Sequence, residues 1–303
     1  MTIERNFYHS VLFFVLALFV SIVGYFVAGV MPVLCLLLVM TIGTSHGALD
    51  HLKGKQLLRC FHIESMLVFY VSYVLVGALT ILVWLAFPET LLMVFLAVAA
   101  FHFGKEDSDF FISSARFPLP EVSYFLKGTV VISAPMLFHK SETLEIFEVL
   151  RFGLSGSVIT NDGFLYGAMI LGFLANLLLA QAQRNRIKIL LCLDFFSVVM
   201  LNFFLHPLLA FTMYFCFLHS IRHSLSLINT IDNMNKSIRI FVKKVAPLTL
   251  ITGIGYLISL YLITNHYTID ESILKVIFIG LASLTFPHIL LEYMLEKKLV
   301  SSK

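Results

Sequence analysis

The stretch PVLCLLLVMTIGTSHGALDHLK, residues 32–53, decides how the rest of the chain is interpreted. An apolar run opens it, and His46, Asp50 and His51 follow near its end. Ionisable side chains are costly inside hydrocarbon, so they are rare in membrane helices unless they serve a function. We therefore predict a membrane-spanning helix that ends in a functional site, with His46 as one ligand of a buried metal ion.

The composition extends this interpretation to the whole chain. Of the 303 residues, 59% are hydrophobic and 13% are charged, and 30 are phenylalanine. These values are typical of an all-α polytopic membrane protein, and we predict a single transmembrane helical domain over residues 1–303. The net charge of +3 is too small and too dispersed to indicate a nucleic-acid partner, whereas membrane lipids are expected neighbours.

Apolar runs of roughly 17 to 25 residues predict about ten transmembrane helices. The predicted spans are residues 7–30, 32–50, 63–87, 90–104, 120–138, 163–182, 187–205, 208–228, 245–264 and 272–294. Most of the 21 Lys and Arg residues then lie on the side of the N-terminus, while Lys140, Arg151 and Lys275 lie on the other. By the positive-inside rule, both termini are predicted to be cytoplasmic in a multi-pass protein of the inner (plasma) membrane.

Several histidines are predicted to lie at one depth, near the cytoplasmic ends of four helices. They are His46, His51, His102, His219, His223 and His288. The other histidines fall at the ends of spans, where an ordinary interfacial role is expected. Depth alone does not bring the six together, because the sequence does not give the order of the helices in the bundle.

Spacing adds a second constraint at His219 and His223. Residues four apart share one face of a helix, which allows two imidazoles to bind one metal ion. The alternative is a pair of histidines that hydrogen-bond to neighbouring helices. In AFHFGKED, residues 100–107, His102 is flanked by two phenylalanines, and Gly104 is predicted to end the helix.

The polar residues after His46 suggest supporting roles. Asp50 lies four residues on, so on a continuing helix its carboxylate would either orient the imidazole or bind the metal in a two-histidine-one-carboxylate site. His51 would point about 100° away on such a helix and suits a cap or an interfacial position. Gly47 permits either close helix approach or a turn.

Arg222 has two possible partners. Its guanidinium could reach the cytoplasmic headgroups, or it could pair with Asp50, Glu106 or Asp107. A cluster of neutral imidazoles around a divalent cation would also need negative charge nearby, which Asp50 or Asp107 could supply. The candidate supporting residues are Asp50, His51, Asp107 and Arg222.

Three elements occur in order along the chain: HGALDH at 46–51, FHFGxxD at 101–107 and HSxRH at 219–223. This ordered set resembles the Brp/Blh-type β-carotene 15,15′-dioxygenase family over about residues 40–295. The resemblance implies cleavage of the central double bond of β-carotene by O₂, giving two molecules of all-trans-retinal that would supply a microbial rhodopsin. It also implies that the catalytic iron ligands are His46, His102, His219 and His223.

The chemistry of these residues agrees with the resemblance. Splitting a carbon–carbon double bond with O₂ needs a redox-active metal, which excludes zinc. Neutral imidazoles suit Fe(II) and leave coordination positions for O₂ as co-substrate. A long, apolar carotenoid would be served by a tunnel among the helices rather than by an aqueous cleft.

Other classes of function remain open at this point. A haem-binding electron carrier would use two of the histidines as axial ligands. A metal-ion or proton transporter would also carry polar residues in its spans, although no inverted repeat is visible. A membrane di-iron hydroxylase would carry repeated H-x-x-H-H clusters, which this sequence lacks.

Overall fold

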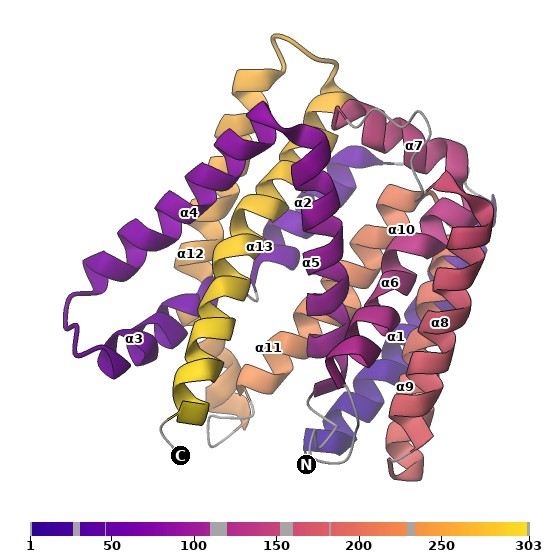
Figure 1. Ribbon diagram of the computed structural model, residues 1–303, viewed down its shortest axis with the longest axis horizontal. Coiled ribbons are helices and arrows are strands. Elements are labelled where there is room, and N and C mark those ends of the chain that lie inside the picture. The colour runs from indigo at the N-terminus through magenta and orange to yellow at the C-terminus, as the bar shows by residue number, and fades with distance from the viewer. Residues whose placement is uncertain are drawn as a thin grey trace.

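The apolar runs form helices that stand side by side in a computed structural model of the chain (Figure 1). The structure describes residues 2–26, 31–45, 47–109, 120–151, 160–181, 183–228 and 234–301. Within these residues the regular structure is entirely helical, which confirms the predicted all-α class. Both termini lie at the same end of the bundle (Figure 1).

Eight helical segments are long and apolar enough to cross a membrane, so the chain is a multi-pass membrane protein. They are α1 (Thr2–Phe26), α2 (Pro32–Thr41) continued into α3 (Asp50–Cys60), α4 (Met66–Ala86), α5 (Pro88–Asp109), α8 (Asp162–Gln181), α9 (Asn185–Phe204), α12 (Met234–Ile263) and α13 (Ile269–Ser301).

The remaining helices account for the difference from the ten predicted spans. They are α6 (Pro120–Phe138), α7 (Lys140–Val149), α10 (Pro207–Met213), η5 (Tyr214–Ser220) and α11 (Ile221–Ile228). Residues 120–138 do form a helix, but α6 carries charged residues at Glu121 and Lys127. Residues 208–228 are divided among three helical segments. The count of ten is therefore not confirmed.

Helix α5 continues past Gly104 to Asp109, so the predicted helix stop at Gly104 is wrong. A Cβ at Gly104 would collide with the carbonyl oxygen of Tyr124 on α6, and one at Gly128 would collide with that of Ala100 on α5. Small residues at a crossing let two membrane helices approach closely. Gly104 thus serves helix packing, and the extra helical turn carries Glu106 and Asp107.

The second predicted span breaks where the polar residues begin. Helix α2 ends at Thr41, and two 3₁₀ turns, η1 (Gly43–Ser45) and η2 (Gly47–Leu49), lead into α3. Gly47 therefore lies in a turn, one of the two roles predicted for it. Because α2 ends at Thr41 and α3 begins at Asp50, the predicted continuous helix over residues 32–50 is wrong.

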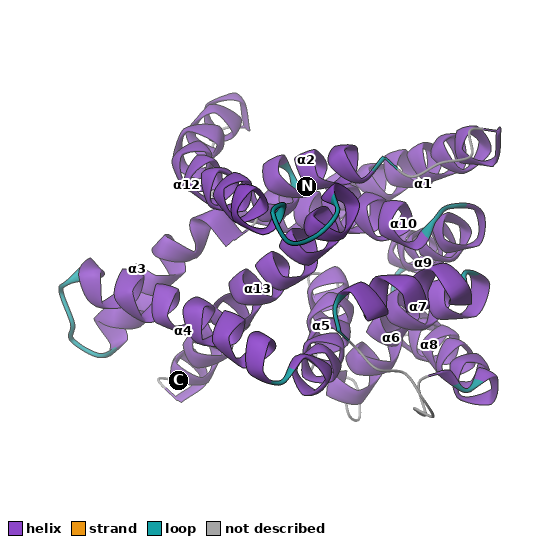
Figure 2. Ribbon diagram, turned by 90° about the horizontal axis from the view of Figure 1, so that it is seen from above, coloured by secondary structure: helices purple, strands orange, loops and turns teal. Residues whose placement is uncertain are grey.

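Helix α13 lies between α4 and α12 and contacts both of them (Figure 2). It also packs against α2, α3, α5 and α7. This position brings residues near the C-terminus of the chain beside the HGALDH and FHFG elements.

Candidate metal centre

Histidines from four helical segments lie close together inside the bundle. The ring centroids of His102 on α5 and His219 on η5 are 5.2 Å apart, and those of His102 and His288 on α13 are 5.3 Å apart. The His223 ring on α11 lies 5.9 Å from that of His288. All four histidines are buried. The structure thus brings His102, His219 and His223 together, and His288 joins them. Their role as metal ligands stays a prediction.

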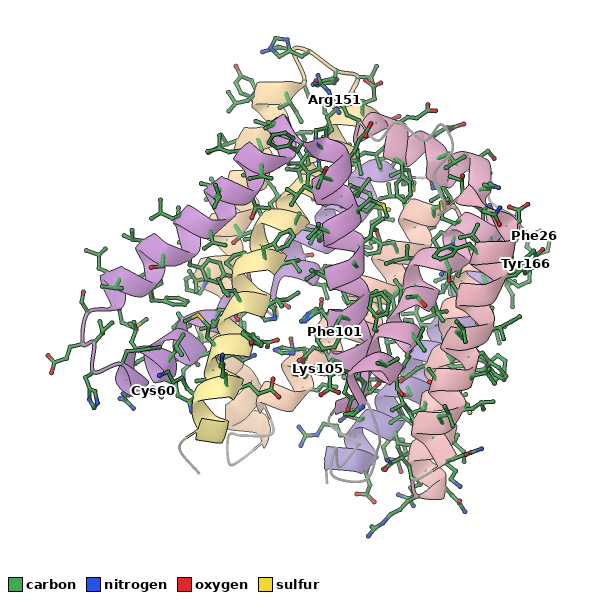
Figure 3. All side chains as sticks on the ribbon, in the orientation of Figure 1. Phe26, Cys60, Phe101, Lys105, Arg151 and Tyr166 are labelled. Carbon is green, nitrogen blue, oxygen red and sulfur yellow. The ribbon has the colours of Figure 1, made fainter. Side chains whose placement is uncertain are left out.

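The cluster lies toward the end of the bundle that holds both termini. Lys105, one turn beyond His102 on α5, lies toward that end, and Arg151 lies at the opposite end (Figure 3). The two ends therefore separate these basic residues as the charge pattern predicts.

Asp107 holds His219 in place. Nδ1 of His219 donates to Oδ1 of Asp107 at 3.1 Å, and the Tyr214 hydroxyl donates to Oδ2 at 2.7 Å. Residues five apart on an α-helix point about 140° apart. Residues 214–220 are instead wound as a π-helix, a form that is frequent at functional sites, and Tyr214 and His219 both reach the same carboxylate.

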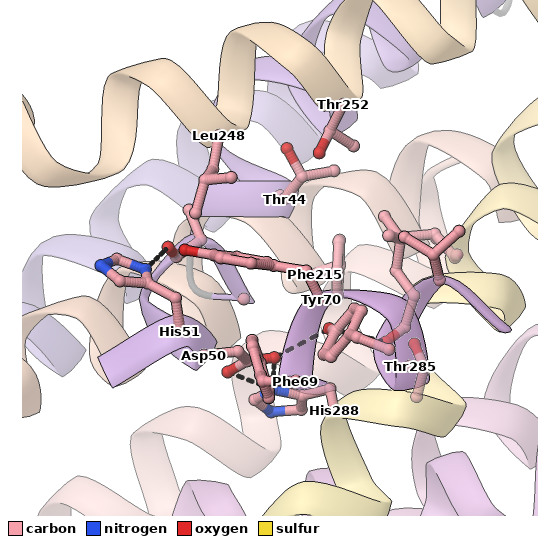
Figure 4. A pocket seen from close by; sticks show the side chains of 17 residues that line it. Thr44, Asp50, His51, Phe69, Tyr70, Phe215, Leu248, Thr252, Thr285 and His288 are labelled. Carbon is pink, nitrogen blue, oxygen red and sulfur yellow. Dashed lines mark hydrogen bonds and ion pairs between the residues drawn. The ribbon is translucent and has the colours of Figure 1, made fainter. Parts of the chain in front are cut away.

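Asp50 holds His288 in the same way. Nδ1 of His288 lies 2.9 Å from Oδ1 and 2.8 Å from Oδ2 of Asp50, and the Tyr73 hydroxyl on α4 donates to Oδ2 at 2.8 Å (Figure 4). The predicted role of Asp50 in orienting an imidazole thus applies to His288. A carboxylate on one ring nitrogen fixes the tautomer and leaves the other nitrogen as the one that would bind a metal.

Glu106 orients His223 as Asp107 and Asp50 orient the other two imidazoles. Nδ1 of His223 donates to Oε2 of Glu106 at 3.1 Å. Nζ of Lys53 pairs with Oε1 of Glu292 at 2.5 Å and lies 3.5 Å from Nε2 of His223. Lys53 therefore lies beside the histidine cluster, where its charge balances that of Glu292.

The remaining predicted residues have other environments. His46 lies outside the described residues. Nδ1 of His51 lies 3.0 Å from the carbonyl oxygen of Ala48, so its ring is held by the preceding turn, as suits a cap. Arg222 is buried, and its direct ion-pair partner is an acid other than the three proposed for it.

Arg222 is completely buried and forms a two-point ion pair with Asp194 on α9. Its Nη1 lies 2.5 Å from Oδ2 and its Nη2 3.1 Å from Oδ1 of that carboxylate. Nη2 also donates to the Ser10 hydroxyl on α1 at 2.7 Å. The pair fixes α11, and with it His223, against α1 and α9. Asp194 was missed because it lies in the middle of an apolar run.

Glu292 and Tyr73 are not among the residues predicted from the sequence, and His288 has no predicted role beyond its depth. One signal was available, because His102 and Glu106, and likewise His288 and Glu292, are four residues apart. The same spacing separates His219 and His223. Helix α5, helix α13 and the continuous stretch of η5 and α11 therefore each carry two candidate ligands four residues apart. Three such pairs indicate a metal site more strongly than any one pair alone.

The donor set suits a transition metal of intermediate softness. His102, His288 and Glu292 each offer a ligand atom within 4.8 Å of the other two, and so do Glu106, His223 and Glu292. Imidazoles with a few carboxylates are typical of non-haem iron sites with open positions. Asp50, Glu106 and Asp107 surround these imidazoles and can balance a divalent charge.

The region that contains the histidine cluster is similar to known proteins. A family model described as beta-carotene 15,15′-dioxygenase matches residues 37–296, which include every histidine of the cluster. The chain belongs to this family. The β-carotene 15,15′-dioxygenase of the uncultured marine bacterium 66A03 is 27% identical over 264 residues, which are 84% of this chain and 90% of that protein. The resemblance seen in the three sequence elements is therefore confirmed. No solved structure matches the chain.

Proposed function

We propose that this member of the β-carotene 15,15′-dioxygenase family cleaves the central 15,15′ double bond of β-carotene in the inner membrane. One O₂ is consumed, the carbon–carbon double bond breaks, and each carbon receives one oxygen atom, which gives two molecules of all-trans-retinal. The retinal would supply a microbial rhodopsin. Family membership and the convergence of His102, His219 and His223 support this proposal.

The proposed cofactor is non-haem Fe(II), held by His46, His102, His219 and His223, with His288 as an additional ligand. The fit rests on the donor set: Nδ1 of three imidazoles is engaged by Asp107, Glu106 and Asp50, so Nε2 is the atom that would bind the metal. At His223, Lys53 would have to move away from Nε2 when the metal binds. Bound Fe(II) would supply the redox chemistry that lets O₂ react with the polyene.

Residues around the cluster orient the imidazoles and exclude water. Tyr214 and Tyr73 orient Asp107 and Asp50, which in turn orient two imidazoles. Phe103 and Phe215 pack on His219, with ring centroids 4.8 and 5.8 Å from it. This apolar packing keeps bulk water away from a reaction whose substrate is itself apolar.

A haem carrier is less well supported by the same contacts. A haem takes at most two axial imidazoles. It would leave the remaining histidines of the cluster, each with its own carboxylate or ring contact, without a role. The many-histidine arrangement therefore favours a non-haem centre.

The experiment compares the wild type with His102→Ala, His223→Ala and His288→Ala in bacterial cells that accumulate β-carotene. The wild type is expected to remove the carotenoid colour, form retinal and retain iron after purification. Each variant should lose iron affinity by about 100-fold or more, because even residues behind the ligands contribute 10–100-fold.

His266→Ala is the matched control, because His266 is an exposed histidine beyond the end of α12. It should retain both iron and activity. The proposed activity is contradicted if folded, iron-loaded wild type forms no retinal from β-carotene under O₂. The proposed ligands are contradicted if the three variants keep the iron content of the wild type.

A further inference from the structure

Two adjoining cavities lie along α13, between α4 and α12. The inner one has a volume of about 230 Å³ and the outer one about 560 Å³. Thr252 on α12 and Leu284 on α13 line both of them, so the cavities meet at that level. We call the combined space the α4–α12 groove.

The inner end of the α4–α12 groove reaches the candidate metal centre. His288, Asp50 and Tyr73 line it, and the close-up shows His288 and Asp50 on one side of the cavity with Leu248 and Thr252 on the other (Figure 4). A molecule in the groove would therefore place its inner part beside the histidine cluster.

The outer end is lined by polar side chains near the opposite end of the bundle. Nη2 of Arg151 donates to the Tyr267 hydroxyl at 3.1 Å, and Nζ of Lys275 lies 4.6 Å from the centre of the Tyr267 ring. Lys275 also donates to the carbonyl oxygen of Val149. These contacts hold α7, α13 and the segment before α13 together, and they form a stop across the outer end.

The groove between these ends is long and apolar. From His288 to Lys275 it follows α13 for about 13 residues, or roughly 20 Å at the rise of an α-helix. Trp84, Ile279 and Val276 are among its walls, and no carboxylate lines its outer part. An uncharged, extended hydrocarbon fits this lining, whereas a charged or strongly polar solute does not.

The two flanking helices are the least covered of the apolar helices. Only 6% of the apolar window of α4 and 11% of that of α12 are buried, against 44% for α13. In a membrane the exposed faces of α4 and α12 contact lipid tails. A hydrocarbon dissolved in the bilayer could therefore enter between them without crossing water.

We propose that the α4–α12 groove binds one arm of the carotenoid substrate, with the ring end at Tyr267 and the double bond to be cleaved at the histidine cluster. This inference rests on the proposed function. Because Arg151, Lys275 and Tyr267 block the outer end, the groove also limits how far the arm inserts. The distance from that stop to the cluster therefore selects which double bond meets the metal.

Gly255 on α12 gives a direct test, because it lines the groove and nothing lies within 4 Å of a Cβ built on it. Gly255→Leu would place an isobutyl group in the groove at a position where the Cβ meets no described atom. Gly167→Leu on α8 is the matched control, since its Cβ position is equally open but lines none of the cavities described here.

Wild type and both variants are purified under anaerobic conditions from cells that accumulate β-carotene, and bound carotenoid and bound iron are measured. Gly255→Leu should retain about one-tenth or less of the carotenoid bound by wild type, which corresponds to 1.4 kcal/mol or more, with unchanged iron. Gly167→Leu should match the wild type in both. After O₂ is admitted, retinal formation by Gly255→Leu should fall in parallel with binding.

The groove is ruled out as the substrate site if Gly255→Leu binds carotenoid and forms retinal as the wild type does. It is also ruled out if the wild type retains phospholipid in place of carotenoid and Gly255→Leu loses only that lipid. If Gly255→Leu loses iron or aggregates, Ser259→Leu, which fills the groove one turn further along α12, replaces it under the same criteria. Failure of the proposed function is distinct, because wild type and Gly167→Leu would then both bind carotenoid and form no retinal.

Discussion

The bundle has two halves that differ in how closely their helices pack. In the closed half, formed by α1, α5, α6, α8 and α9, glycines bring backbones into contact: a Cβ at Gly104, Gly128 or Gly172 would meet a carbonyl oxygen of the facing helix. The open half, formed by α4, α12 and α13, has one such close approach, where a Cβ at Gly77 on α4 would meet the carbonyl oxygen of Ser283 on α13. Gly255 on α12, however, faces empty space, and the α4–α12 groove separates α4 from α12.

The histidine cluster lies between these halves and draws on both. His102 and Asp107 come from α5 of the closed half, whereas His288 comes from α13 of the open half. A binding site needs ligands held rigidly by their surroundings and also a path for the substrate. The closed half packs tightly and holds its ligands rigidly, whereas the open half contains the groove through which the substrate could enter.

The largest expected effect comes from disturbing the closed half. In Gly104→Val, the added side chain would collide with the carbonyl oxygen of Tyr124, and α5 and α6 would have to separate. The cost should exceed the 1–3 kcal/mol typical of an overpacked side chain, because backbone cannot move aside as a side chain does. We expect little monodisperse protein after detergent extraction and a lower unfolding temperature.

Gly167→Val is the control for this prediction, because the same substitution there meets open space. It should extract and unfold like the wild type. Equal stability of the two variants would show that the closed half is not closely packed at the crossing of α5 and α6, and the contrast between the halves would fail.

A smaller effect is expected from the carboxylates that orient the histidines. Asp107→Asn removes the charge that holds His219 in the closed half, and Asp50→Asn does the same for His288 in the open half. Loss of such a partner typically weakens metal affinity by about 10–100-fold. We expect Asp107→Asn to lie at the upper end of this range and Asp50→Asn at the lower.

The loss of metal affinity should be smaller in Asp50→Asn because a water molecule has more room to replace the lost carboxylate there. Asp50 lines the inner cavity of about 230 Å³, where a water molecule could take up part of its role, whereas the cavity beside Asp107 has a volume of only about 30 Å³. Titration of the metal-free proteins with Fe(II) under anaerobic conditions measures both affinities. If Asp50→Asn lost more Fe(II) affinity than Asp107→Asn, the assignment of the closed and open halves would be contradicted.

The sequence predicted the helices and three members of the cluster because both depend on local patterns. Apolar length predicts a span, and the spacing of His219 and His223 predicts a shared face. The partners of these residues depend instead on the order of helices in the bundle. His288 meets Asp50 across 238 positions of sequence, and no local pattern joins them.

The errors have specific physical causes. Arg222 was assigned acids at its own depth, but its partner Asp194 lies inside an apolar run that gave no polar signal. Gly104 was assigned to a helix end because glycine serves equally for stops and for close crossings. Only the position of α6 distinguishes the two, and that position is a property of the whole bundle.

The smallest expected effect tests how the open half recognises its ligand. Tyr256 lines the α4–α12 groove, and its buried hydroxyl has no hydrogen-bond partner among the described residues. Tyr256→Phe should therefore leave stability within about 0.5 kcal/mol of the wild type, with unchanged iron. The KM for β-carotene should change by about twofold or less, which corresponds to roughly 0.4 kcal/mol.

Tyr73→Phe is the comparison for this small effect, because the Tyr73 hydroxyl donates to Asp50 and its loss should lower iron affinity measurably. If the groove recognises its ligand by apolar shape, only the tyrosine that supports a ligand histidine matters. A rise in KM well above twofold in Tyr256→Phe would mean that the Tyr256 hydroxyl contacts a polar group of the substrate. The preferred carotenoid would then carry oxygen on the arm that enters the groove, and space alone would not explain recognition in the open half.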